Sequence, residues 1–522
     1  MADVNVTTTT PSQAPLSSKE SSRIIARNSA FVMGSQVAIR ILAFIFQVYV
    51  VRSLGSVDYG KFATVMAYLM IFSIFSDFGM APYTVREMAR HWTRSRRLIS
   101  NTMFIRLVLS VAVVIVATSV AILLDYAPDI VTGVFIAGCG LFLYAFQGPL
   151  DGAVVARERL DVTARLQIVN QLIFVAVGTL MLVAGVGFIG LILATLLGVG
   201  VWGLGLWRFS RRKLGLEMGR IDPGIWRELL IGALPFGVAG LAVVLMQRFD
   251  TIVLSLAHQG LPTTLPGLNC TLCLPPSAYE FMVTGEQLVG WYAVSVNLVL
   301  MTMLLAQSVA QAMYPTLVRE HARDPEAIRK PIQQVVKYLM VISLPIAVGT
   351  TVLADQIIVK LYTAEFAPSI ITLRILIWAM PLMFLSEVLG RAMSVLRLER
   401  AGARRMLFTA GVVVVLDLAL IPALGLLGAA LSFMIGRILI VALELNLVGV
   451  GLFFSRETLG TLARVSVAAA VMGAAALWMH DRNLFLIIGV SMAIYAVGLI
   501  VTGGLRVGEA LRVARMILGR SA

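Results

Sequence analysis

Charge is scarce in this sequence. Asp, Glu, Lys and Arg together make up 13% of the 522 residues, whereas hydrophobic residues make up 59%. A chain with so few charged residues cannot cover a soluble globule of this length with a hydrated surface. The scarcity excludes a soluble globular fold and favours a polytopic membrane protein.

Cysteine is almost absent. Of the three cysteines, Cys139 lies in an apolar stretch, and Cys270 and Cys273 form the "NCTLC" pair in the longest predicted outer loop, 257–288. A zinc site would need two more ligands, and His258 is the loop's only imidazole. We therefore expect a Cys270–Cys273 disulfide or two free thiols, and no metal.

Nucleotide-binding motifs are incomplete. "GSVDYGKF" at 55–62 matches the start of a phosphate-binding loop, but Phe62 stands where Ser or Thr would reach magnesium. The G-x-G-x-x-G matches at 185–190 and 198–203 follow no strand and are typical of packing glycines in membrane helices. We expect no nucleotide and no cofactor, so uphill transport would use the membrane potential, product consumption or a gradient of a coupling ion, H+ or Na+.

Long apolar segments dominate what is present. Each is about 20 residues, enough at about 1.5 Å per residue to cross a hydrocarbon core of about 30 Å. The sequence predicts an all-α membrane protein with fourteen spans: 28–51, 62–84, 99–124, 131–155, 166–185, 187–207, 229–250, 289–317, 333–356, 370–390, 406–424, 426–452, 461–479 and 484–504.

The distribution of Lys and Arg predicts the orientation. With both termini in the cytoplasm, 33 of the 42 Lys and Arg residues lie in cytoplasmic segments, and the outer loops hold Arg52, Lys61, Lys360 and Arg482. The net charge of +14 then reflects topology, with anionic membrane lipid as partner and no nucleic acid. We expect a multi-pass protein of the cell membrane.

A repeated phrase divides the chain. "PYTVREMAR" at 82–90 and "PTLVREHAR" at 315–323 share six residues in register, each where a predicted span reaches the cytoplasm. Parallel six-helix repeats are a common plan of secondary transporters, with the substrate path between the two halves. The predicted domains are a disordered cytoplasmic tail (1–27), a first six-helix lobe (28–228) and a second six-helix lobe (229–456) with the 257–288 insertion. Two additional spans (457–504) and a basic amphipathic cytoplasmic tail (505–522) follow.

Polar residues inside predicted spans are the candidate site, because an ionisable group in lipid usually faces a cavity or a partner. Gln36, Arg40 and Gln47 share one face of the first span, as in a water-filled cavity that receives an anion. Asp77 in the second span is a further candidate cavity residue, and the alternative is that it forms a packed ion pair with Arg40.

Further polar residues are candidates with two interpretations. Arg248 and Asp250 are equally compatible with an interfacial salt bridge and with ligand contact, and Asn297 adds polar character to the eighth span. The remaining intramembrane charges are interpreted as structural or coupling groups: Asp151, Glu387, Asp417, Arg437 and Glu444.

The tract "RSLGSVDYGKFATVMAYLMIFSIFSDFGMAPYTVREMAR" at 52–90 resembles the opening of the polysaccharide-transporter branch of the multidrug/oligosaccharidyl-lipid/polysaccharide flippase superfamily. That family's pattern runs R-x-L-G-x-x-x-Y-G-x-F, then an acidic residue and Gly, then R-E. "RFDTIVLS" at 248–255 and "GWYAVSVNL" at 290–298 resemble its second half. The 257–288 insertion departs from the family's short link.

The resemblance implies two lobes around a central cavity, alternating access, and export of lipid-linked oligosaccharide to the outer leaflet for cell-surface polysaccharide. Association with polysaccharide assembly enzymes is a further expectation. The alternatives are a lipid II flippase, a cation-coupled multidrug antiporter and, in another class, a membrane-embedded glycan polymerase or ligase. The short outer loops offer little catalytic chemistry, so a transporter and no enzyme is expected.

Overall fold

The computed structural model describes residues 18–257 and 284–503, without the side chains of 18–33, 35 and 325. Every regular element in these two ranges is a helix, as predicted. In chain order the long helices are α1 Ser18–Asp77, α3 Ser95–Leu123, α4 Pro128–Ala156, α5 Leu160–Val183, α6 Gly187–Lys213, α7 Trp226–Ser255, α8 Gly285–Arg323, α9 Arg329–Leu361, α11 Ala379–Val395, α12 Glu399–Leu424, α13 Leu426–Val448, α15 Arg456–Trp478 and α16 Leu484–Val501.

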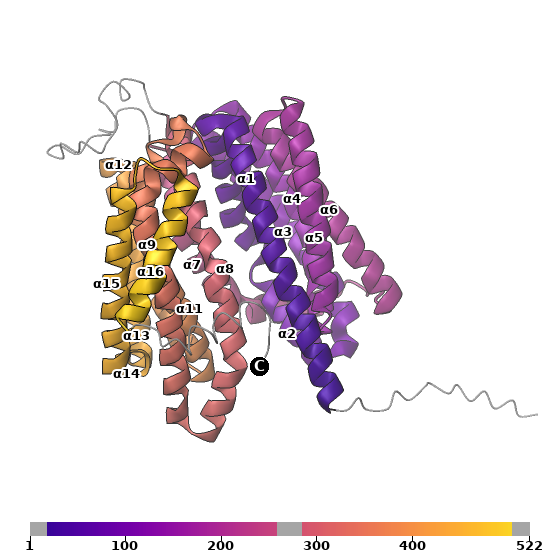
Figure 1. Cartoon of the computed structure of the whole chain (residues 1–522). Coiled ribbons are helices and arrows are strands. Elements are labelled where there is room, and N and C mark those ends of the chain that lie inside the picture. The colour runs from indigo at the N-terminus through magenta and orange to yellow at the C-terminus, as the bar shows by residue number, and fades with distance from the viewer. Residues whose placement is uncertain (1–17, 258–283, 504–522) are drawn as a thin grey trace, which may run out of the picture.

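Short helices join the long ones. They are α2 Met80–Arg90, α10 Ser369–Leu376, α14 Val450–Phe453, and the 3-10 turns η1 Trp92–Arg94, η2 Pro223–Ile225, η4 Pro325–Ile328 and η5 Ala364–Phe366. Figure 1 shows α1 to α6, coloured indigo to magenta, beside α8 to α16, coloured salmon to yellow.

Thirteen helices in the described ranges are long and apolar enough to cross a membrane. The first of them, Gln36–Asp77, contains parts of two predicted spans. Its 42 residues would extend for about 63 Å if straight, twice a hydrocarbon core. The chain cannot be straight there, because Gly55 has φ 72° and ψ −176° and Gln47 donates a hydrogen bond to the Tyr59 hydroxyl twelve residues later. The chain reverses at Gly55, which gives two crossings and agrees with about fourteen.

Two predicted boundaries were wrong. The second crossing ends at Asp77 and not at residue 84, because Phe78 and Gly79 have φ of 51° and 77° and break the helix before α2. The glycine is required, since a Cβ at Gly79 would overlap the backbone of Gly237 in α7. The predicted span 370–390 is α10 followed by α11, which continues to Val395 and brings Arg391 into a helix.

The tails and the insertion are only partly described. The structure begins with α1 at Ser18, inside the predicted 1–27 tail. Residues 1–17, 258–283 and 504–522 lie outside the described residues, and so do the Cys270–Cys273 pair and the whole predicted amphipathic tail, 505–522. Cys139 is a free thiol.

Candidate functional site

The predicted polar stripe on α1 divides into two parts. Gln36 donates a hydrogen bond to Gln167 of α5 at 2.8 Å, and Gln47 donates to Tyr59 at 3.3 Å. Both amides therefore already have protein partners. Arg40, one turn after Gln36, is exposed and lines a cavity.

The cavity has a volume of about 550 Å³ and lies between α1 and four later helices. Residues of α7, α8, α11 and α13 form the other walls. The lining residues are Arg40, Gln247, Leu300, Met303, Gln307, Met383, Ser386, Glu387, Gly390, Arg391 and Arg437. Among the described side chains, Arg40 is the lining residue that comes from α1 to α6, and the others come from α7 to α13. A ligand here would therefore touch both groups of helices, α1 to α6 and α7 to α16.

The cavity is rich in cations. Of the lining side chains that the structure describes, Arg40, Arg391 and Arg437 are cations and Glu387 is the one carboxylate. The described residues contain no ion pair to any of these four within 4.0 Å, although the Arg437 guanidinium lies 4.8 Å from the Phe433 ring. The guanidinium groups are thus free to bind an anion, and arginine binds phosphate oxygens in a bidentate manner.

Asp77 does not pair with Arg40. Its carboxylate lies 3.2 Å from Nη1 of Arg106 on α3, and it accepts a hydrogen bond from the backbone N–H of Ala81 at 3.2 Å. Asp77 is not a lining residue of the cavity. The predicted alternative, an ion pair between Arg40 and Asp77, is wrong, because Asp77 pairs with Arg106 of α3.

Three other predicted cavity residues lie outside its lining. Arg248 contacts the Met70 sulfur, with Nε at 3.2 Å. Asp250 is buried and accepts hydrogen bonds from the Tyr292 hydroxyl at 2.5 Å and the Thr251 backbone at 2.6 Å. Asn297 donates to the Tyr59 hydroxyl at 2.9 Å, so it binds the two groups of helices together.

The predicted structural charges separate into different roles. Asp151 accepts a hydrogen bond from Thr163, and Glu444 accepts one from Ser386 at 2.7 Å. Glu387 and Arg437 line the cavity, and Arg437 is not ion-paired with Glu444 in the described chain. Asp417 is 1% exposed, and neither of its oxygens has a hydrogen-bond partner in the residues described.

Sequence reasoning missed Arg391 and Gln247. The predicted tenth span ends at 390, one residue before Arg391, and this boundary leaves Arg391 outside the span. A helical pattern continued to Val395 would have placed Arg391 one turn after Glu387. Gln247 directly precedes Arg248, which is a predicted site residue. The sequence contains no pattern that shows which of these two neighbours faces the cavity.

Near Gly55, where α1 reverses, contacts join α1 to α8 and α9. Arg52 donates hydrogen bonds to the carbonyls of Leu361, at 2.7 Å, and Lys360. A Cβ at Gly60 would overlap the Glu286 carbonyl, and one at Gly290 would overlap the Ser56 carbonyl, so α1 and α8 touch backbone to backbone. Lys61, the lysine of the phosphate-loop-like sequence, pairs with Asp129 at 2.5 Å and Asp58 at 3.6 Å.

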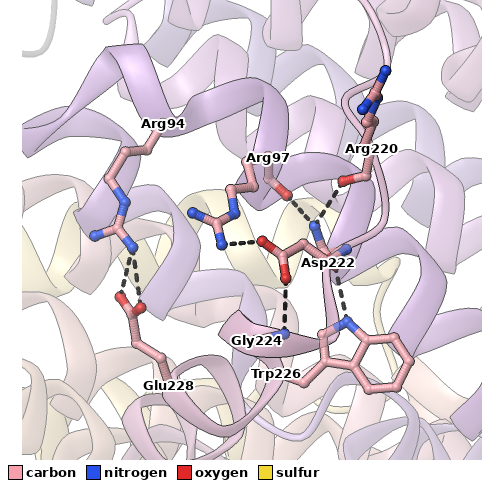
Figure 2. A network of polar contacts seen from close by, with 8 residues as sticks. Arg94, Arg97, Arg220, Asp222, Gly224, Trp226 and Glu228 are labelled. Carbon is pink, nitrogen blue, oxygen red and sulfur yellow. Dashed lines mark hydrogen bonds and ion pairs between the residues drawn. The ribbon is translucent and has the colours of Figure 1, made fainter.

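The opposite end carries a network that fastens the connection between α6 and α7 to the start of α3 (Figure 2). Arg94 pairs with Glu228 at 3.0 Å, and Arg97 pairs with Asp222. Asn101 accepts hydrogen bonds from the Asp222 backbone at 2.8 Å and the Trp226 indole at 2.9 Å. The start of α7 is therefore attached to the start of α3 by ion pairs and hydrogen bonds.

A family model described as "Polysaccharide biosynthesis protein" matches residues 25–321, and a second model with that description matches 281–371. The chain belongs to this family of polysaccharide biosynthesis proteins. The match includes Arg40 and the backbone contact of α1 with α8 at Gly60 and Gly290. It confirms the resemblance seen in the tract at 52–90.

Relatives and solved structures agree with the family. The chain is 22% identical over 445 residues to the probable low-salt glycan biosynthesis flippase Agl15 of Haloferax volcanii, covering 83% of this chain and 86% of that protein. The fold of this chain is similar to that of the lipid II flippase MurJ in an inward closed conformation. The TM-score is 0.71 at 12% identity, and the match covers 90% of this chain and 98% of that chain. The fold is also similar to that of an inward-facing multidrug resistance MATE family transporter of the MOP superfamily. The TM-score is 0.56 at 16% identity, and the match covers 82% of this chain and 96% of that chain.

These findings confirm the predicted fold class. The chain is a multi-pass membrane protein with the fold of flippases and transporters of the MOP superfamily. Its relatives are transporters and not enzymes, in agreement with the prediction of a transporter.

Proposed function

We propose that this protein is a flippase that moves a polyprenyl-diphosphate-linked oligosaccharide from the inner to the outer leaflet by alternating access, for cell-surface polysaccharide synthesis. The observation that carries the proposal is the cavity between the two groups of helices, with three arginines that have no carboxylate partner there. An anionic diphosphate and its sugars cannot cross hydrocarbon unaided. A cationic, amide-lined cavity would replace water around the head while the polyprenyl tail stays in lipid.

The closed outer end supports a state that loads from the cytoplasm. Arg52, Glu365 and the paired glycines Gly60 and Gly290 hold α1 against the later helices at that end. The lysines and arginines of the opposite end define it as cytoplasmic by the charge rule. In this orientation both termini are cytoplasmic, and release requires the outer contacts to separate.

Coupling to an H+ or Na+ gradient would act through Asp417. A buried carboxylate without hydrogen bonds is costly when charged, and a proton or sodium ion would relieve that cost. Asp250 lies on α7, a helix that contacts both α2 and α12, so binding near these acids would reach both groups of helices. Contact with polysaccharide assembly enzymes would supply the substrate and consume the product.

A vesicle assay tests the proposal. The purified full chain is reconstituted into sealed liposomes with a polyprenyl diphosphate carrying a labelled disaccharide, and a glycosidase is added outside. We expect nearly all the probe to be cleaved, against about half in protein-free vesicles. Lipid II is assayed in parallel. Movement of lipid II alone would assign the lipid II role, and movement of neither lipid would overturn the proposal.

A further inference from the structure

Glu387 and Arg391 lie four residues apart on α11 and both line the cavity. Four residues advance a helix by about 6 Å and return to the same face, so the two side chains are neighbours. Both are half-buried. The second group of helices thus presents one carboxylate and one guanidinium side by side.

The two side chains do not neutralise each other. A glutamate four residues before an arginine is in the favourable order for an ion pair, yet no N–O distance between them is within 4.0 Å. Ser386, the adjacent hydroxyl, donates to Glu444 instead. In the part of the chain that the structure describes, Glu387 accepts no hydrogen bond, so its oxygens are available to a ligand.

A carboxylate is unexpected in a cavity for an anion, because it repels the diphosphate that the three arginines attract. An ionised carboxylate can only accept hydrogen bonds. The group it faces must therefore be a donor, such as a hydroxyl or an amide N–H. The first sugar of a lipid-linked glycan carries such donors and is bonded directly to the diphosphate.

We propose that Glu387 is a specificity residue that accepts a hydrogen bond from the first sugar, while Arg391 binds the adjoining diphosphate. The proposal rests on the proposed function of the same cavity. Since Glu387 and Arg391 are neighbours on one face of α11, they would contact two neighbouring groups of the substrate, the first sugar and the diphosphate. A carboxylate at this position selects a sugar with a donor group over a lipid diphosphate without one.

The test measures binding of two probes to the full chain in lipid nanodiscs. One probe is polyprenyl diphosphate, and the other is the same lipid carrying one N-acetylhexosamine. For Glu387→Ala we expect about tenfold weaker binding of the sugar-bearing probe relative to the bare diphosphate, whose own binding should stay the same or become tighter because a repelling charge is removed. Arg391→Ala should weaken both probes, and Glu387→Gln should lose less than Glu387→Ala because it keeps an acceptor oxygen.

The control is Glu399→Ala, which removes an exposed carboxylate at the start of α12, and all variants must give wild-type elution and melting temperature. Equal weakening of both probes by Glu387→Ala, or no weakening of either, would overturn the role of Glu387. A wild-type chain that binds neither probe would instead count against the proposed function.

Discussion

The carboxylate of Glu365 accepts a hydrogen bond from the backbone N–H of Ser56 at 2.7 Å. Ser56 begins the helical segment that follows the reversal at Gly55, so Glu365 caps a helix N-terminus from the other group of helices. Arg52 does the reverse and caps the last carbonyls of α9. Each helix end has the charge that its dipole favours, and this exchange joins α1 to α9 and to the segment that follows α9, at the end that we propose to be the outer one.

Glu365→Ala should weaken the outer closure. Loss of a helix cap costs about 1 kcal/mol, which corresponds to roughly a fivefold shift toward the outward-open state. The measurement is labelling by an impermeant thiol reagent of a cysteine introduced at Met303, which lines the cavity, after the three native cysteines are replaced by serine. Glu399→Ala serves as the control. Unchanged labelling would show that Glu365 does not hold the closure.

Arg40→Ala should abolish export while membrane abundance stays normal. Arg40 has no ion-pair partner in the described residues, so its removal leaves no carboxylate uncompensated. Arg40→Lys should recover part of the activity, because it restores a point charge without the bidentate guanidinium. The vesicle assay and membrane abundance are measured together, with Arg90→Ala as an exposed arginine control. A fall in abundance would indicate a structural role instead.

Arg106→Ala should lower the amount of folded protein. Arg106 is 7% exposed and compensates Asp77, so its loss leaves a partly buried carboxylate at a cost of about 3 kcal/mol. Asp77→Asn combined with Arg106→Ala should restore much of the yield. The readout is abundance and melting temperature, and failure of the double variant to recover would mean that Arg106 acts through packing.

Asp417→Asn should separate substrate binding from gradient-driven transport. The amide removes a buried charge with little change in shape, so we expect normal abundance and normal probe binding. Export stimulated by an imposed H+ or Na+ gradient should be lost. Asp151→Asn, which changes a carboxylate bonded to Thr163, is the control. Persistent gradient stimulation in Asp417→Asn would remove Asp417 from the coupling mechanism.

Cysteines at Ser53 and Thr363 should be labelled by an impermeant reagent in intact cells, whereas one at Thr93 should be labelled only after permeabilisation. All three residues are exposed, so access depends on the side of the membrane and not on burial. The native cysteines are again replaced. Labelling of Thr93→Cys in intact cells would reverse the proposed orientation.

The candidate site could be predicted only in part. The polar stripe on α1 singles out Arg40, because a cation in a membrane helix must meet water, a partner or a ligand, and Arg40 lines the cavity. The same rule could not rank Gln36 and Gln47, whose partners Gln167 and Tyr59 depend on how α5 and the reversed chain pack. Arg391 was missed because its helix extends beyond the predicted boundary.

The sequence alone determined that this is a helical membrane protein of the polysaccharide biosynthesis family. Span length, charge scarcity and the tract at 52–90 are local properties, and the bilayer requires each span to satisfy its own backbone. The tertiary structure decided which charges meet. Asp77 pairs with Arg106 and not Arg40, and Glu387 and Arg391 face the cavity unpaired. Side-chain partners depend on which helices, distant in the chain, pack against each other. Helical periodicity shows which face of a helix a residue lies on, but not which helix packs against that face.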